Sequence, residues 1–236
     1  MKLSEVKALI TGGSVGIGLA TARRLTAAGA KIAICGRNEA AVEKAAKEIG
    51  AFAVRADVGD ESDVRNMVKQ VGDEFGGFNT LVNNAGMGKF GPLVDLELAE
   101  FQEVMRTNVF GAMLVARESA KHFIERGEGG NIINISSTAG GAGFAGGTAY
   151  VASKFALGGM TQCWRAELRK SDIRVMQVNP SEVLTEFAER AGYGQKAANP
   201  TKLRGEEIAH AITSVLEMDG RGFTTELTVF ATNPQD

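Results

Sequence analysis

Short apolar segments alternate with longer amphipathic segments along almost the whole chain. The apolar segments have the length of strands, and the segments between them have the periodicity of helices. The expected strands are 6–10, 31–35, 51–56, 79–86 (a strand running into a turn), 130–136, 173–180 and 226–231. The expected helices are 16–29, 39–50, 60–76, about 100–126, about 149–169 and 205–218. Buried strands that alternate with helices form right-handed βαβ units. The pattern therefore predicts an α/β fold, a doubly wound parallel sheet of about seven strands with helices on both faces.

The rest of the chain-wide evidence excludes several classes of protein. No linker, repeat or low-complexity tract interrupts the 236 residues, so we expect a single domain over residues 1–236. A net charge of −2 gives no sign of a nucleic-acid partner. No apolar run approaches the ~20 residues of a membrane span, and the N-terminal apolar stretch is too short for a signal peptide. The only two cysteines, Cys35 and Cys163, predict no disulfide framework and favour a cytoplasmic location. The cysteines and histidines lack ligand spacing, so no metal is expected.

The turn after the first expected strand, "TGGSVGIG" (11–18), is rich in glycine. Gly12, Gly16 and Gly18 remove side chains where the backbone must turn tightly and approach a ligand closely. The following helix N-terminus offers N–H groups and a partial positive charge, which suit a pyrophosphate. Glycines are also common in ordinary strand–helix turns, so this turn alone leaves nucleotide binding and a plain connection equally open.

The same turn also fits the G-x-S-x-G nucleophile elbow of α/β-hydrolases, with Ser14 as the nucleophile. Both histidines, His122 and His210, follow Ser14, as the order of that catalytic triad requires. However, the elbow would follow the first strand, and no earlier strand would supply the second oxyanion donor. The hydrolase interpretation is therefore a minor alternative.

Further motifs follow the glycine turn in a fixed order. They are "NNAG" (83–86), "RTNVFG" (106–111), Ser137 and, thirteen residues after Ser137, the tyrosine of "AYVASK" (149–154). In order, spacing and element context, this set strongly resembles the classical short-chain dehydrogenase/reductases, including members similar to 3-oxoacyl-acyl-carrier-protein reductase. The resemblance covers nearly the whole chain, from residue 11 to about residue 185.

The resemblance implies a Rossmann fold, a nicotinamide cofactor and an oxidoreductase that interconverts a ketone and a secondary alcohol. The catalytic residues that it implies are Asn108, Ser137, Tyr150 and Lys154. The cofactor contacts that it implies are Thr11, Gly12, Ser14, Gly16, Ile17, Gly18, Asp57, Val58, Asn84, Ala85, Gly86, Tyr150, Lys154, Pro180, Val183 and Thr185. One departure is Ser181, which stands where the family usually has glycine, and it puts the local backbone shape in question.

Tyr150 and Lys154 stand four residues apart on an expected helix, so their side chains share one face. An ammonium beside a phenol favours the phenolate, and we expect Lys154 to lower the pKa of Tyr150. Tyr150 would then exchange a proton with the substrate oxygen, which Ser137 would polarise. The resemblance implies that Lys154 holds the nicotinamide ribose and Asn108 a water that relays the proton. A non-catalytic NADP-sensing protein on the same fold is the second interpretation.

The end of the second expected strand indicates which cofactor is used. A Rossmann site for NAD usually has an acidic residue about 20 residues past the glycine turn, bonded to the ribose 2′-OH. Here Gly36 takes that place and Arg37 follows. Glycine does not repel a 2′-phosphate, and a guanidinium binds phosphate oxygens through paired donors. We therefore expect NADP(H) to be preferred, with NAD(H) possible if Arg37 is only a solvated cation. Many NADP-dependent members also have a basic residue in the glycine turn, where this chain has Val15.

The irregular segment 181–204 is the expected substrate lid. It contains Phe187 and Tyr193, which do not define one substrate. The expected partner is a small-molecule carbonyl or alcohol, with a 3-oxoacyl or similar small ketone as the leading expectation. The chain end lacks the "VDGG" stretch common in acyl reductases, which weighs against that expectation.

The resemblance also implies a homodimer or homotetramer, built through the helices near 100–126 and 149–169. Three large apolar residues there are either interface or core: Phe155, Trp164 and Leu168.

Overall fold

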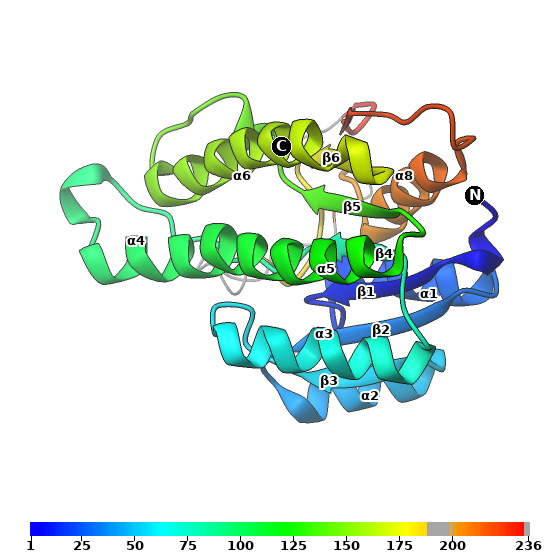
Figure 1. Ribbon diagram of the computed structural model, residues 1–236. Helices are drawn as coiled ribbons and strands as arrows, with labels where there is room; N and C mark the ends of the chain where they lie inside the picture. Colours follow the sequence, from blue (N-terminus) through cyan, green and yellow to red (C-terminus); the bar gives the residue numbers. More distant parts are fainter. Residues whose placement is uncertain (188–198, 200, 234–236) are drawn as a thin grey trace.

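The computed structural model describes residues 1–187, 199 and 201–233 (Figure 1). Within this part, seven parallel strands form one sheet in the order β3–β2–β1–β4–β5–β6–β7. The strands are β1 (Lys7–Thr11), β2 (Lys31–Gly36), β3 (Phe52–Arg55), β4 (Thr80–Asn83), β5 (Gly130–Ile135), β6 (Ile173–Pro180) and β7 (Glu226–Val229). The predicted doubly wound parallel sheet is confirmed.

The main helices are α1 (Gly16–Ala27), α2 (Glu39–Ile49), α3 (Glu61–Phe75), α4 (Leu98–Met105), α5 (Ala112–Arg126), α6 (Thr148–Leu168) and α8 (Gly205–Glu217). Their ends follow local sequence signals. The side chains of Asn38 and Asp60 cap α2 and α3 by accepting backbone N–H bonds, and Gly50 and Gly76 end these helices in the left-handed conformation. Local chemistry therefore accounts for several boundaries without any tertiary contact.

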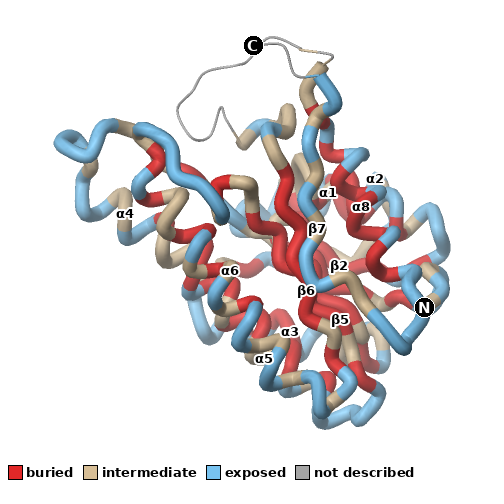
Figure 2. Tube along the Cα trace, turned by 90° about the horizontal axis from the view of Figure 1, so that it is seen from above, coloured by how far each residue is buried: buried red, intermediate tan, exposed pale blue. Residues whose placement is uncertain are grey.

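Two apolar clusters lie on the two faces of the sheet. Successive residues of a strand point to opposite faces, so in β1 Ile10 belongs to one cluster and Leu9 to the other. The helices α1, α2 and α8 cover the first face, while α3 and α5 cover the second. Figure 2 shows the buried residues concentrated along the sheet between these helical layers. Because both faces are covered, the ligand-accessible part of the sheet is its end, where the strands stop.

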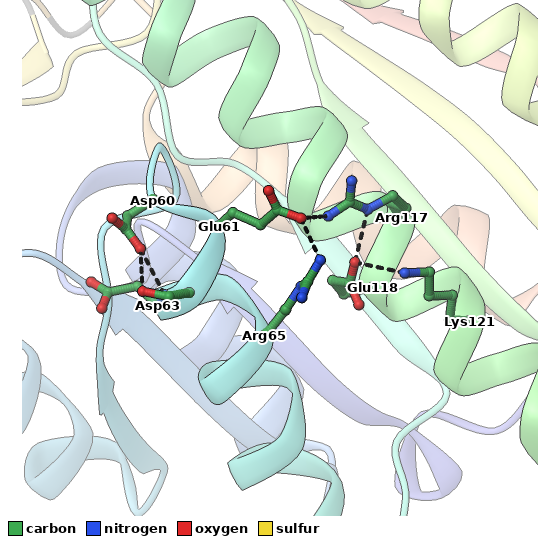
Figure 3. A network of polar contacts seen from close by, with 8 residues as sticks. Asp60, Glu61, Asp63, Arg65, Arg117, Glu118 and Lys121 are labelled. Carbon is green, nitrogen blue, oxygen red and sulfur yellow. Dashed lines mark hydrogen bonds and ion pairs between the residues drawn. The ribbon is translucent and has the colours of Figure 1, made fainter.

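Surface ion pairs join α3 to α5 on the second face (Figure 3). Glu61 accepts hydrogen bonds from Arg65 and Arg117, both at 2.6 Å. Glu118 accepts from Arg117 at 2.8 Å and from Lys121 at 3.0 Å. All of these side chains except Glu118 are substantially exposed, and exposed ion pairs contribute little to stability, so we expect the network to add little stability.

The predicted helix around 100–126 differs from the structure. Here α4 and α5 are separated by one π-helical turn, Arg106–Gly111. Asn108 is buried in this turn, and its side chain makes three hydrogen bonds to segments far away in the sequence. Because such turns depend on tertiary partners, helical periodicity did not predict the interruption. Among the described helices, none is long and apolar enough to cross a bilayer.

Candidate active site

Two neighbouring hollows lie where the strands end, next to the point at which connections from β1 and β4 run in opposite directions. The smaller hollow has a volume of about 200 Å³, and the larger cleft about 1490 Å³. The predicted site residues that line the smaller one are Gly12, Gly16, Ile17, Asn84, Ala85, Gly86, Ser137, Tyr150, Lys154, Pro180, Val183 and Thr185. The larger cleft shares Ser137, Tyr150 and the segment 181–187. Folding thus brings together most of the predicted residues from five separate parts of the chain.

The glycine turn leaves room for a ligand beside the start of α1. Gly12 and Gly16 have φ of +63° and +54°, values that side chains other than glycine rarely adopt. A Cβ at Gly18 would lie 2.4 Å from the Gly12 carbonyl oxygen. No side chain caps the N-terminus of α1, so its N–H groups are available to an anion. In addition, the buried Ser136 hydroxyl lines the smaller hollow without a hydrogen-bond partner. These features fit a dinucleotide.

Thr11 positions this turn from beneath and does not line the hollow. Its buried Oγ1 accepts the N–H groups of Asn84 at 3.0 Å and Ala85 at 2.9 Å. The Asn84 side chain in turn donates to the carbonyl oxygens of Thr11 at 2.9 Å and Gly12 at 3.1 Å. The turns after β1 and β4 are therefore locked to one another.

Lys154 and Tyr150 share the face of α6 that meets the end of β5. The Nζ of Lys154 donates to the Ile135 carbonyl oxygen at 2.9 Å and lies 5.5 Å from the centre of the Tyr150 ring. Burial lowers the pKa of Lys154 to about 8. Burial raises the pKa of Tyr150, and a hydrogen bond with the Ser137 side chain opposes this only in part. The expected lowering of the Tyr150 pKa is therefore wrong for this structure, because desolvation of the buried phenol outweighs the Ser137 hydrogen bond.

Ser137 follows β5, and its Oγ accepts the N–H of Ala139 at 3.1 Å. Asn108 lies behind this group and lines neither hollow among the described residues. Its Oδ1 accepts from the Met87 N–H at 2.8 Å, and its Nδ2 donates to the Met87 carbonyl oxygen and to Ser153 Oγ, at 2.8 and 2.9 Å. Because both Nδ2 hydrogens are engaged, Asn108 joins the loop after β4 to α6 more directly than it reaches a substrate.

The ends of β2 and β3 form the far side of the site. A Cβ on Gly36 would lie 3.0 Å from Val42 Cγ2 and 3.8 Å from the Ser14 hydroxyl, so this position packs closely against α2 beside the glycine turn. Arg37 is exposed beside it. Val58 is buried, and Asp57 accepts from the Gly59 N–H and from Arg106, both at 2.9 Å. Partial burial works against ionisation, but these hydrogen bonds, with the charges of Arg106 and Arg37, lower the pKa of Asp57.

Arg106 is a site residue that sequence reasoning missed. It comes from the π-helical turn and packs against Gly59, where an added Cβ would lie 2.8 Å from the guanidinium carbon. Nothing in its local sequence indicated a partner 49 residues away. The π-helical turn therefore contacts the β3–α3 loop through Arg106 and the β4–α4 loop through Asn108.

The segment after β6 closes over the glycine turn. The Ser181 N–H donates to Val229, and Val183 and Leu184 pair with Leu203. The Thr185 side chain lies against Gly16. Ser181 is not among the described residues with positive φ, so serine replaces the usual glycine here without backbone strain. The rest of the predicted lid, 188–198 and 200, lies outside the described residues.

The histidines do not assemble a hydrolase triad with Ser14. His122 accepts the Phe78 N–H at 3.2 Å and stacks on the Phe78 ring, while His210 contacts Arg24. Both cysteines are free. The described part of the chain holds no group of three or more candidate metal ligands.

Comparison with known proteins agrees with this geometry. A family model described as short chain dehydrogenase matches residues 6–196. The oxidoreductase YxnA of Bacillus subtilis (strain 168) is 36% identical over 197 residues, 80% of this chain and 55% of YxnA, so the chain spans about half of that relative's length. Human 3-oxoacyl-[acyl-carrier-protein] reductase is 33% identical over 213 residues, 88% of this chain and 90% of the relative.

Solved structures agree over almost the full chain. A 3-ketoacyl-(acyl-carrier-protein) reductase from Brucella melitensis, complexed with NADH, has a TM-score of 0.86 at 31% identity. The match covers 95% of this chain and 96% of the reductase chain. An alcohol dehydrogenase from the archaeon Thermococcus sibiricus, complexed with 5-hydroxy-NADP, has a TM-score of 0.84 at 28% identity, with coverages of 97% and 98%. Fold, motif placement and these matches lead to one conclusion: the chain belongs to the short-chain dehydrogenase family of NAD(P)-binding oxidoreductases.

Proposed function

We propose that the protein is an NADP(H)-dependent oxidoreductase that interconverts a ketone and a secondary alcohol in a single domain. The observation that carries this proposal is the grouping of Ser137, Tyr150 and Lys154 between the glycine-turn hollow and the larger cleft. The nicotinamide cofactor supplies or accepts the hydride when it is bound. Residues of the glycine turn, Asn84 to Gly86 and Pro180 to Thr185 would hold it.

The protein residues would handle the substrate oxygen and its proton. Burial keeps the Tyr150 phenol protonated, so Tyr150 is suited to donate a proton to the oxygen during carbonyl reduction. Ser137, in hydrogen-bond contact with Tyr150, would polarise the same oxygen. Lys154, with a pKa of about 8, is mostly charged at neutral pH, and its charge would favour the phenolate that remains after proton transfer.

The preference for NADP(H) rests on Gly36 and Arg37. Gly36 lies next to Ser14 of the glycine turn and carries no acidic side chain that would repel a 2′-phosphate. The charge of Arg37 reaches the same edge of the site, since it also acts on Asp57. The two solved relatives described above carry an NADP derivative and NADH, so the family admits both cofactors.

Further proposals concern assembly and location. Phe110 and Phe155 lie exposed on the π-helical turn and on α6, which suits a homodimer or homotetramer built through these helices. Trp164 and Leu168 pack instead against the second core cluster. A cytoplasmic location accords with the two free cysteines.

The test is a coupled assay in which NADPH oxidation is followed over a panel of ketones, with Tyr150→Phe as the key variant. Loss of the proton donor should lower turnover by at least ~10²-fold. Titration of NADPH fluorescence should show nearly unchanged cofactor binding in the variant. A wild-type protein that binds NADPH but reduces no ketone would support the non-catalytic interpretation, and near-normal turnover in Tyr150→Phe would remove the tyrosine from the mechanism.

A further inference from the structure

Two phenylalanine rings lie against the ring of the proposed proton donor, and a third lies beside one of them. The centres of the Phe90 and Phe187 rings lie 5.4 and 5.5 Å from the centre of the Tyr150 ring, and Phe144 lies 6.0 Å from Phe90. All four rings line the larger cleft together with Ser137. These separations fall in the range of favourable aromatic pairs. The part of the cleft next to Tyr150 is therefore lined by aromatic rings, and we call Phe90, Phe144 and Phe187 the aromatic wall.

Glycines hold the aromatic wall in place. A Cβ at Gly88 would lie 2.6 Å from the Phe90 ring and 3.0 Å from the Phe187 ring, so both rings rest against Gly88. A Cβ at Gly147 would lie 2.8 Å from the Phe144 ring. The loops that carry Phe90 and Phe144 are joined by a hydrogen bond from Gly91 to Gly146, at 2.9 Å. The backbone thus restricts the positions of the rings, although Phe144 remains half exposed at the mouth of the cleft.

The same cleft has an acidic balance of charge. The charged residues that line it in the described part of the chain are Glu182, Glu186, Glu206, Glu226, Arg23 and Arg204. Arg23 is paired with Glu48, and Glu182 is paired with Lys202, so one lining charge of each sign is offset. The remaining carboxylates, Glu186, Glu206 and Glu226, still outnumber Arg204. An anionic substrate would therefore enter against the local potential.

We propose that the cleft takes an uncharged cyclic or aryl ketone, or the corresponding secondary alcohol, with its ring against the aromatic wall. A planar or saturated ring presents broad apolar faces to Phe90 and Phe187 while its oxygen reaches Tyr150 and Ser137. The acidic balance disfavours carboxylates, phosphates and thioesters on acidic carriers. This inference rests on the proposed function, because it concerns the substrate of the same site.

The first experiment compares matched ketones with the wild-type enzyme and NADPH. Cyclohexanone is paired with 2-hexanone, acetophenone with 2-octanone, and methyl acetoacetate with acetoacetate. Each ring compound and the neutral ester should exceed its partner in kcat/KM by about tenfold or more. Equal or better use of the open-chain or anionic partner would overturn the inference, even with the proposed reaction intact.

Variants of the aromatic wall then test whether these rings cause the preference for ring ketones. Phe90→Leu and Phe144→Leu should lower the ring preference about tenfold, while Phe75→Leu, a phenylalanine that packs on Phe52 away from the cleft, should not change it. Retained ring preference in both wall variants would count against the inference. Calorimetric binding of cyclohexanol and 2-hexanol to the NADPH-loaded protein gives a readout without turnover, because this complex has no hydride acceptor. Ring preference in binding without any turnover would leave the inference standing and reject the proposed reaction, and equal binding would reject the inference.

Discussion

The Nζ of Lys154 donates to the carbonyl oxygen of Ile135 and lies 5.5 Å from the centre of the Tyr150 ring. This ammonium is buried beside the proposed proton donor, with one backbone oxygen as its hydrogen-bond acceptor. A buried charge with so few partners costs folding free energy. The lysine is thus retained at a position where it reduces stability, which is typical of a functional group.

Replacing Lys154 with methionine should stabilise the cofactor-free protein. The shift of the Lys154 pKa from 10.5 to about 8 corresponds to a desolvation cost of roughly 3 kcal/mol, which the substitution removes. The substitution also loses the hydrogen bond to Ile135, which costs about 1 kcal/mol of stability. The net gain of roughly 2 kcal/mol should raise Tm by a few degrees while turnover collapses. Lys69→Met, at an exposed site paired with Asp73, is the matched control and should change Tm little.

The lowered pKa of Lys154 also makes the free energy of unfolding depend on pH. Between pH 8 and 10.5 the unfolded chain keeps the Lys154 proton that the folded chain has released, so this group makes the wild type more stable as pH rises through that window. Lys154→Met should lack this contribution. Urea unfolding at pH 7 and pH 10 measures the difference, and an equal pH response in both proteins would show that the ammonium is not desolvated.

Arg37→Asp should move cofactor preference from NADPH toward NADH. The carboxylate repels a 2′-phosphate and accepts a bond from a 2′-OH, so the ratio of kcat/KM for the two cofactors should change by about tenfold or more. Arg37→Gln removes attraction without adding repulsion and should give an intermediate ratio. If the wild type already uses NADH as efficiently as NADPH, the interpretation of Gly36 and Arg37 is wrong.

Thr11→Val should destabilise the fold and weaken cofactor binding together. The N–H groups of Asn84 and Ala85 would lose their acceptor in a buried place, which costs about 2 kcal/mol or more. Thr11→Ser keeps the hydroxyl and serves as the control, with most of the stability retained. Urea unfolding and NADPH titration check the two effects, and equal behaviour of the two variants would mean that the hydroxyl does not lock the turns.

His122 should make the protein less stable as the pH falls below about 6.5. Burial, together with the charge of Arg126, lowers the pKa of His122, whose Nε2 accepts from the Phe78 N–H. The unfolded chain then takes up the proton before the folded chain does, so the free energy of unfolding decreases with falling pH. His122→Gln should flatten the change in Tm between pH 7 and 5, and an unchanged slope would assign it to other groups.

Local patterns were sufficient for most of the architecture. Every expected strand exists, and the bounds of most elements lie within one or two residues of the expected ones, because glycines, caps and apolar periodicity act over a few residues. The expected strand that runs into a turn over 79–86 is also present, since β4 ends at Asn83 and the following residues turn into the site. The π-helical turn had no comparable local signal, because long-range bonds from Asn108 support it.

For the site, the order and spacing of the motifs were enough to identify the family and the candidate residues. Only the folded packing decided how those residues behave. It raised the pKa of Tyr150 by burial, placed Arg106 on Asp57, and brought Phe90 and Phe187 from distant loops against the Tyr150 ring. The reason is physical: burial and long-range contacts arise from the whole chain, whereas a motif describes only neighbouring residues.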